Sequence, residues 1–287
     1  MSFGEEKEIS LGNSEPVVCR GVKKNPGSIE GVEIVIERAR ELCEKAGMGW
    51  VLMILDGSPN RVIIDKLFSE DERVTVQDVC VVNGLLHILK EFTLVVLVFV
   101  RAIDSGLLFS LGFESPNHQE WICNAKDLHK AVDCVFSLEE SIGLELTMRI
   151  CQEKGLKIAD LDSSTFWGYV NEEKEESGGW LRFVYKSLFF VSALKSAIGL
   201  ANFPAIDCCL NQLDTLLFIK GHGFYSKIRC FEVLRKKLLK NRSDGADMLK
   251  LLNNVSVLVN KDGLSYEGSD GKLEEDNRVL KRMVNFL

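Results

Sequence analysis

Short apolar runs of strand length alternate with stretches of helical periodicity in the first half of the chain, and this alternation constrains the fold most. The runs at 50–55 (WVLMIL), 79–82 (VCVV) and 93–100 (TLVVLVFV) read as buried strands. The run at 93–100 is rich in β-branched residues and almost wholly apolar, which is typical of a central strand in a parallel sheet. Residues 132–136 (VDCVF) read as a further strand. Strands that alternate with helices predict an α/β layer with parallel pairing.

Helical periodicity fills the segments between these runs. A helix is expected between Ser28, which can cap its start, and Gly47, which ends it. Residues 74–92 read either as a strand followed by a helix from Gly84 or as one long helix, and we favour the first interpretation. Further helices are expected over 60–68 and 138–154.

The second half of the chain is mainly helical in pattern. It begins with a charged, glycine-ended run at 171–179 (NEEKEESGG), which is typical of a solvated loop or hinge. Residues 255–259 and 264–267 then read as the two strands of a hairpin around the turn 260–263 (NKDG). The expected helices are 180–200, 206–219, 223–241, 244–253 and, at the end, 273–286.

The composition limits the classes of binding partner and the cellular location that we expect for this chain. The 287 residues are 46% hydrophobic, enough to bury a sizeable core, and carry a net charge of −7 with a pI near 5.3. Such a chain is not expected to coat nucleic acid along its whole length, because that binding needs clustered cations. No run reaches about 18 apolar residues and the start has no signal-peptide pattern, so we expect a soluble, intracellular protein.

The nine cysteines show no C-x-x-C spacing and are predicted to be buried thiols. His118, Cys123, His129 and Cys134 lie close together in sequence and have the chemistry of zinc ligands. Their spacings match no common zinc finger, however, and Cys134 lies in an apolar run. We therefore favour thiols over a metal site.

The segment 17–28 (VVCRGVKKNPGS) has the layout of a phosphate-binding loop, with an apolar run, Gly21, and then Gly27 and Ser28 at the start of a helix. It lacks the lysine that would neutralise the β- and γ-phosphates, and Pro26 removes one backbone N–H from the cradle. We interpret Gly21, Gly27 and Ser28 as the relic of a nucleotide site. No cofactor is expected, although residual ATP binding stays open.

The order of these segments is similar to that of a known family. The chain has an α/β layer, then a helical segment, and then helices with a hairpin. This is the order found in the AAA+ replication initiators of the origin recognition complex and Cdc-six family, and the chain resembles that family over most of 16–287. The matching segments are the sensor-one-like strand at 92–104 with Arg101 and Asp104, the strand and lid helix at 132–155, the aromatic helix start at 224–228 (FYSKI), and the winged-helix repeats at 213–239 and 248–268.

The resemblance implies an AAA+-like parallel sheet with a helical lid, followed by a C-terminal winged-helix domain. The domains it implies are a degenerate AAA+-like domain over 16–137, a lid over 138–200 and a winged helix over 201–287. Residues 1–15, which are polar and contain glycine, are expected to form a mobile N-terminus.

The chain departs from the family at the groups that bind and hydrolyse ATP. Against the family's loop G-x-x-G-x-G-K-[ST], Lys24 and Pro26 occupy two glycine positions, and Gly27 stands where the lysine belongs. At the end of the strand 79–82, Asn83 and Gly84 replace the acidic pair that would hold magnesium.

An alternative alignment places the magnesium site at Asp56-Gly57, where the aspartate is present but the water-polarising glutamate is absent. In either alignment the chain lacks residues that ATP hydrolysis needs. Family members also supply an arginine to a neighbour's site, and Arg101 is the candidate here.

Cations gather in and after the helix 223–241, where they could contact DNA phosphates without reading bases. The alternative is that they favour the helix C-terminus and stay solvated. The following helix, 244–253, carries Asp244 and Asp247 against Lys250, so sequence-specific reading of the major groove is not expected. The DNA-binding candidates are Lys227, Arg229, Arg235, Lys236, Lys237, Lys240, Arg242 and, at the hairpin turn, Lys261.

Three functions follow as hypotheses. The first is a non-hydrolysing subunit of the origin recognition complex, located in the nucleus, whose partners are the other subunits and double-stranded DNA. The second is an intracellular protein-docking scaffold without DNA binding, which the acidic pI favours. The third is a metal-dependent hydrolase that uses Asp56 and Asp104, but no His or Glu lies close in sequence to act as the base.

Overall fold

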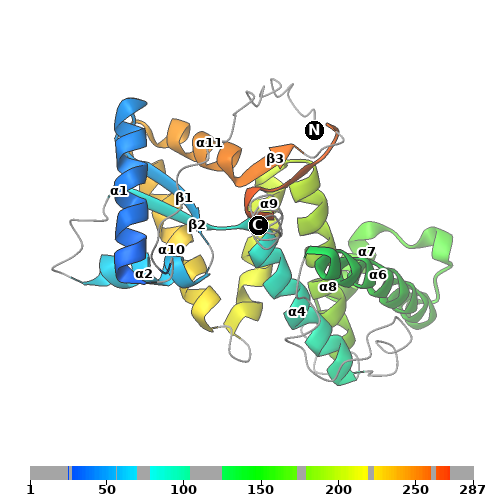
Figure 1. Cartoon of the computed structure of the whole chain (residues 1–287). Helices are drawn as coiled ribbons and strands as arrows, with labels where there is room; N and C mark the ends of the chain where they lie inside the picture. Colours follow the sequence, from blue (N-terminus) through cyan, green and yellow to red (C-terminus); the bar gives the residue numbers. More distant parts are fainter. Residues whose placement is uncertain are drawn as a thin grey trace.

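A computed structural model describes Asn25 and residues 28–55, 57–69, 78–103, 125–172, 179–218, 223–259 and 263–271. These residues are mostly helical and contain two small sheets of two strands each. Figure 1 shows two lobes. The α/β lobe holds α1, α2, β1, β2, α10 and α11, and the helical lobe holds α4, α6, α7, α8 and α9.

The α/β lobe is built on two parallel strands. β1 (Val51–Leu55) pairs with β2 (Val79–Asn83) from Val51 opposite Val79 to Leu55 opposite Asn83. α1 (Ile29–Lys45) and α2 (Gly57–Phe68) cover one face of this sheet, and α11 (Gly245–Ser256) covers the other. α10 (Gly223–Lys240) packs against both β2 and α2, and contributes Phe231 to the core on the first face and Leu239 to the core on the second. The predicted strands at 50–55 and 79–82 are therefore confirmed.

Alternation along β2 explains how both faces become buried. Val79 and Val81 pack on the side of α1 and α2, against Val32 and Ile63. Cys80 and Val82 point to the opposite side, where they pack against Leu239, Met248 and Leu252 of α10 and α11. A strand that is apolar at every position can be buried on both faces in this way, because successive side chains point to opposite faces.

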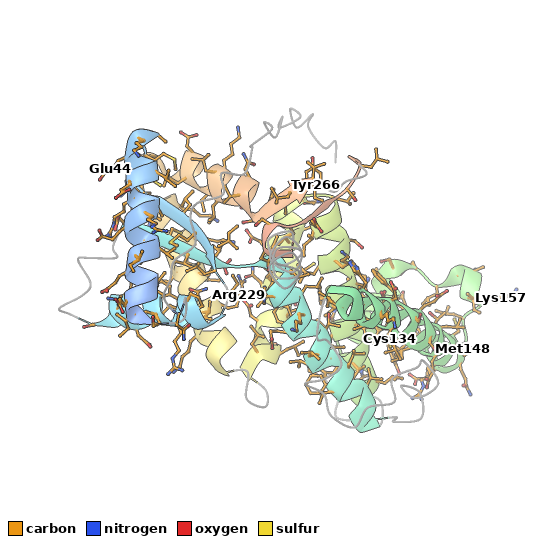
Figure 2. All side chains as sticks on the ribbon, viewed as in Figure 1. Glu44, Cys134, Met148, Lys157, Arg229 and Tyr266 are labelled. Carbon is orange, nitrogen blue, oxygen red and sulfur yellow. The ribbon has the colours of Figure 1, made fainter. Side chains whose placement is uncertain are left out.

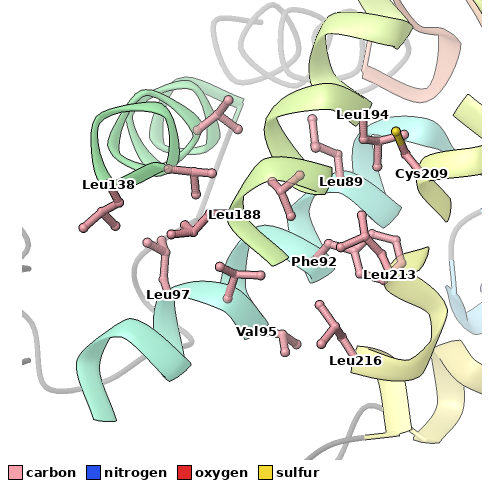
Figure 3. Close-up of a cluster of buried hydrophobic side chains, with 14 of the residues drawn as sticks. Leu89, Phe92, Val95, Leu97, Leu138, Leu188, Leu194, Cys209, Leu213 and Leu216 are labelled. Carbon is pink, nitrogen blue, oxygen red and sulfur yellow. The ribbon is translucent and has the colours of Figure 1, made fainter. Parts of the chain in front are cut away.

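The helical lobe is organised around α8 (Gly179–Gly199), which packs against α4 (Leu85–Ile103), α6 (Ala125–Lys154) and α9 (Phe203–Leu213). In Figure 3, Phe92, Leu188 and Leu213 come from three of these helices and meet in one core. The shorter elements are η2 (Ile158–Asp160), α7 (Ser163–Val170) and η3 (Asp214–Phe218). Within the described residues, no helix is long and apolar enough to cross a membrane.

The predicted hairpin is confirmed as an antiparallel pair. β3 (Val257–Val259) follows α11 directly and pairs with β4 (Tyr266–Gly268), with Val257 opposite Gly268. β4 lies against α4 and α8 of the helical lobe. The turn residues 260–262 and the predicted last helix at 273–286 lie outside the described residues.

The predicted strands at 93–100 and 132–136 are wrong, because both segments are helical. Residues 93–100 lie within α4, where the Thr93 hydroxyl donates to the Leu89 carbonyl one turn earlier at 2.7 Å. The half-buried positions of this run, Leu94 and Val98, are apolar like the buried ones, so the run shows no polar face and cannot be distinguished from a buried strand by periodicity.

Residues 132–136 lie within α6, where burial follows a helical period. Leu128, Val132 and Val135 are buried, and Asp133 and Phe136 are exposed. The prediction of an α/β layer therefore holds in its coarse form, as a small parallel sheet in a mostly helical chain.

The predicted domain limits at 16–137, 138–200 and 201–287 stay predictions, and residues 1–15 lie outside the description. α6 continues from Ala125 to Lys154 across the first limit. α10 and α11, from the last predicted domain, pack on β2 and β1.

The core of the helical lobe should depend on Phe92, which is 0% exposed between α4, α8 and α9. We expect Phe92→Ala to lower the free energy of unfolding by about 3–5 kcal/mol, because it removes a buried ring and leaves a cavity. Leu200→Ala is the control, since Leu200 is 73% exposed, and it should change the value by less than about 0.5 kcal/mol. Urea unfolding measures the stability of both variants, and equal losses would contradict a central role of Phe92 in this core.

Candidate partner-binding and nucleic-acid-binding face on α10

Ser28, the described part of the relic phosphate loop, acts as the cap of α1. Its hydroxyl accepts from the Gly31 N–H at 3.1 Å and donates to the Asn25 carbonyl at 2.7 Å. The Asn25 carbonyl oxygen also lies so close to Gly31 that an added Cβ would clash with it. The chain's own backbone therefore crowds the first turn of α1, and Gly21 and Gly27 lie outside the described residues.

The end of β2 holds an amide pair and a capping carboxylate. Asn60 donates from Nδ2 to Asn83 Oδ1 at 3.3 Å, and both side chains are buried. Asp270, which follows β4, accepts from the backbone N–H groups of Leu86 and His87 at 3.1 and 3.0 Å. Asp270 Oδ2 also lies 2.8 Å from His87 Nδ1. This carboxylate caps α4, as anions do at helix N-termini, and sequence reasoning missed it because 184 residues separate Asp270 from Leu86.

The other catalytic and metal candidates are not brought together by the described residues. His129 is exposed, whereas Cys134 is 5% exposed and burial raises the pKa of its thiol to about 11. Within the described ranges, no group of three metal-ligating side chains occurs. His118, Cys123, Asp56 and Asp104 lie outside the description, as does the side chain of Arg101.

Two of the DNA-binding candidates on α10, Arg229 and Lys236, belong to an ion network whose centre, Arg229 and Glu232, is buried and whose outer end, Asp207, is exposed. Arg229 Nε lies 2.8 Å from Asp214 Oδ1, and Arg229 Nη1 lies 2.8 Å from Glu232 Oε1. Lys236 Nζ lies 3.0 Å from Asp207 Oδ1 and 3.1 Å from Glu232 Oε1. Because Asp207 belongs to α9 and Asp214 to η3, the network joins α10 to the helical lobe, and Figure 2 shows Arg229 near that junction.

Burial and pairing both act on the charges of this network. Burial acts to raise the pKa of Glu232, but the positive charges of Arg229 and Lys236 outweigh it, so the pKa is lowered. Burial acts to lower the pKa of Arg229 and Lys236, but the neighbouring carboxylates outweigh it, so both values are raised. With side chains 3% and 6% exposed, Arg229 and Glu232 serve as a structural pair inside the protein.

The remaining cations divide into paired and exposed groups. Arg242 donates to both carboxylate oxygens of Asp244 at 2.8 and 2.9 Å, and its guanidinium lies 4.6 Å from the ring centre of Trp50. Lys227, Lys237 and Lys240 are exposed along α10. The side chain of Arg235 and all of Lys261 lie outside the described residues.

Two exposed leucines lie among the exposed lysines of α10. Leu234 and Leu238 are each 50% exposed and lie one turn apart. Cys230 and Lys227 lie on the same side of the helix, one and two turns before Leu234. We call Lys227, Cys230, Leu234 and Leu238 the leucine–lysine stripe. The one carboxylate in the sequence of α10 is the buried Glu232, so α10 presents no acidic side chain of its own beside the stripe.

A scan against protein-family models and searches of curated proteins and of solved structures returned no match to this chain. The resemblance to the replication initiators therefore rests on the sequence segments alone.

Removing Arg229 should destabilise the protein strongly, because it leaves the Glu232 carboxylate buried beside a single cation. We expect Arg229→Met to lower the free energy of unfolding by about 3–5 kcal/mol. The double variant Arg229→Met with Glu232→Leu should recover a large part of that loss. Lys227→Met, on the exposed side of the same helix, is the matched control and should change stability by less than about 0.5 kcal/mol. Urea unfolding of the four proteins tests the pair, and an equally stable Arg229→Met variant would refute it.

The lowered pKa of Glu232 should also appear in the pH dependence of stability. A lowered pKa in the folded state stabilises the protein above the usual value of 4.5, and this contribution is lost as the pH falls through the lowered pKa. Below pH 4.5 the free energy of unfolding should thus fall more steeply in the wild type than in Glu232→Gln, by up to about 1.4 kcal/mol per pH unit. Urea titrations at a series of pH values measure how steeply the free energy of unfolding falls with pH in both proteins. Equal slopes would contradict a lowered pKa of Glu232.

Proposed function

We propose that the chain is a non-enzymatic subunit of a multiprotein assembly and that the leucine–lysine stripe docks a partner protein. The observation that carries this proposal is the exposure of Leu234 and Leu238 between Lys227 and Lys240 on one helix. Burial of a leucine contributes roughly 1.5–3 kcal/mol, so two half-exposed leucines offer a favourable contact to another apolar surface. The neighbouring lysines favour a partner surface that carries carboxylates.

The buried ion network supports docking rather than extended contact with DNA. Arg229 and Lys236 are occupied by carboxylates, and Arg242 is held by Asp244 and Trp50. The phosphates of a DNA backbone bind cationic side chains, whereas they offer exposed leucines no comparably favourable contact. The side of α10 that carries the stripe therefore suits a protein better than a row of phosphates.

The assembly that the sequence resemblance suggests is a replication initiator of the origin recognition complex type, in the nucleus. The described order of α10, α11, β3 and β4 is compatible with the helix–helix–hairpin part of a winged helix. Within such an assembly the chain would contribute contacts and not hydrolysis. The capped first turn of α1 and the amide pair Asn60 and Asn83 at the end of β2 support that role.

DNA contact is the second candidate function, and the exposed lysines favour it. Lys227, Lys237 and Lys240 are exposed on the helix that precedes α11 and the hairpin. Three phosphate contacts would give a log–log salt slope of about −3. The hydrolase hypothesis rests on Asp56 and Asp104, which lie outside the described residues and remain untested.

The docking proposal predicts that Leu234→Asp combined with Leu238→Asp lowers recovery of partner proteins at least about tenfold, because the apolar contact is replaced by charge. The measurement is affinity capture of the tagged full chain from its own cells, with partners quantified by mass spectrometry. Leu200→Asp, at another exposed leucine, is the matched control and should leave recovery unchanged.

Retention on double-stranded DNA separates the two candidates. Retention that falls with salt at a slope of about −3, and that is lost when Lys227, Lys237 and Lys240 are changed to Gln, would favour DNA contact. Unchanged partner recovery by the double leucine variant would refute docking through the stripe.

A further inference from the structure

A second exposed stripe lies on α6, at the opposite lobe. Leu144 and Met148 are 57% and 51% exposed and lie one turn apart, like the leucines of α10. Asp133 and Glu140 are exposed on the same side of the helix, toward its N-terminus. We call Asp133, Glu140, Leu144 and Met148 the acid–apolar stripe, and Figure 2 shows Met148 at the outer edge of the helical lobe.

The charge on this stripe is negative close to its apolar pair. Glu145, at its side, is neutralised by Arg149 one turn later in an i,i+4 ion pair. Lys130 is exposed on the turn before Asp133, at the far end from Met148. Glu140, one turn before Leu144, therefore leaves a negative charge beside the apolar pair. Asp133 adds a second negative charge about three turns before Leu144, where Lys195 of α8 lies within electrostatic reach of it. The leucine–lysine stripe has the opposite sign.

We infer that the leucine–lysine stripe of one copy of this chain docks on the acid–apolar stripe of a second copy. This inference rests on the proposed function and names the partner surface. Both stripes carry one pair of large apolar side chains at i and i+4, and each carries the charge that the other lacks. Apolar burial and opposite charge thus favour the same contact.

A parallel alignment of the two helices brings both features into register. With Leu234 opposite Leu144, Leu238 falls opposite Met148. Lys227 then lies about 10 Å before the first apolar pair, while Glu140 and Asp133 lie about 6 and 16 Å before it on the partner helix, at 1.5 Å per residue. The ammonium of Lys227 therefore reaches the level between the two carboxylates.

The two stripes cannot meet within one copy. α10 packs against α2, α11, β2 and η3, and α6 packs against α4, α7, α8 and η2. Figure 1 shows α10 and α6 in different lobes. A contact between the stripes is thus intermolecular and joins unlike surfaces, so each copy keeps one stripe for a further neighbour. Such a contact builds rings or open chains instead of closed two-fold dimers.

Sedimentation of the full chain over a wide concentration range tests the inference. The wild type should rise in mass with concentration, in a micromolar range that suits a contact of two helices. Leu234→Asp and Leu144→Asp each remove one stripe and should each stay monomeric, whereas their equimolar mixture should form a one-to-one dimer, because each variant retains the stripe that the other lacks. Leu200→Asp is the control and should associate like the wild type.

Charge reversal at exposed positions tests the register without altering the apolar pairs. Lys227→Glu should weaken association roughly threefold to tenfold, because it replaces an attraction with a repulsion between exposed charges. Lys227→Glu combined with Asp133→Lys and Glu140→Lys should restore association. Lys45→Glu and Glu44→Lys, on the exposed end of α1, make the same charge changes as Lys227→Glu and Glu140→Lys away from both stripes, and should have no effect. Loss of association in the triple variant would overturn the register.

The outcomes separate this inference from the proposed function. A wild type that stays monomeric at every concentration, or single variants that associate like the wild type, would overturn docking between copies. If the leucine variants then still lose their cellular partners, the proposed docking role stands with a different partner. If partner recovery is also unchanged, both are refuted.

Discussion

The buried carboxylate of Glu232 is the interaction on which the arrangement of the two lobes depends. It lies on α10, which packs against β2 and α2, and it pairs with Arg229 and Lys236, which pair in turn with Asp214 and Asp207. These last two residues belong to η3 and α9, beside the core of the helical lobe. Because an unpaired buried charge costs several kcal/mol, the network holds only when both lobes are in place. It fixes one side of α10 and leaves the opposite side for contacts with other molecules.

The sequence predicts those parts of the fold in which the spacing of apolar residues, or the turn residues beside them, identifies the secondary structure. The strands at 50–55 and 79–82 are bounded by turns and helices, and the hairpin is signalled by its Asn-Lys-Asp-Gly turn. The run at 93–100 is misleading, because its half-buried positions, Leu94 and Val98, are as apolar as its buried ones, so no polar residue within the run shows the helical period. Propensity favours β-branched residues in strands only weakly, and the packing of α4 against α8 outweighs it.

The candidate site is predicted in position but not in detail. The sequence places the cations on the right helix, and the spacing of Arg229, Glu232 and Lys236 at i, i+3 and i+7 already indicates mutual pairing. The carboxylates of Asp207 and Asp214 could not be assigned to this network, because only the folded chain brings α9 and η3 beside α10. The exposure of Leu234 and Leu238 was hidden for the same reason, since an amphipathic pattern alone does not show how wide the buried face is.

The covering of the parallel sheet has a consequence for synthesis on the ribosome. α1 and α2 precede or adjoin β1 and β2 in the chain, but α10, α11 and the capping Asp270 come from the last quarter. During translation one face of the sheet, with Cys80 and Val82, lacks its native cover until those helices emerge. Contacts of such long sequence separation form late and expose apolar surface in the meantime. The nascent chain is therefore a natural client for chaperones that bind exposed aliphatic segments before the final helices are released.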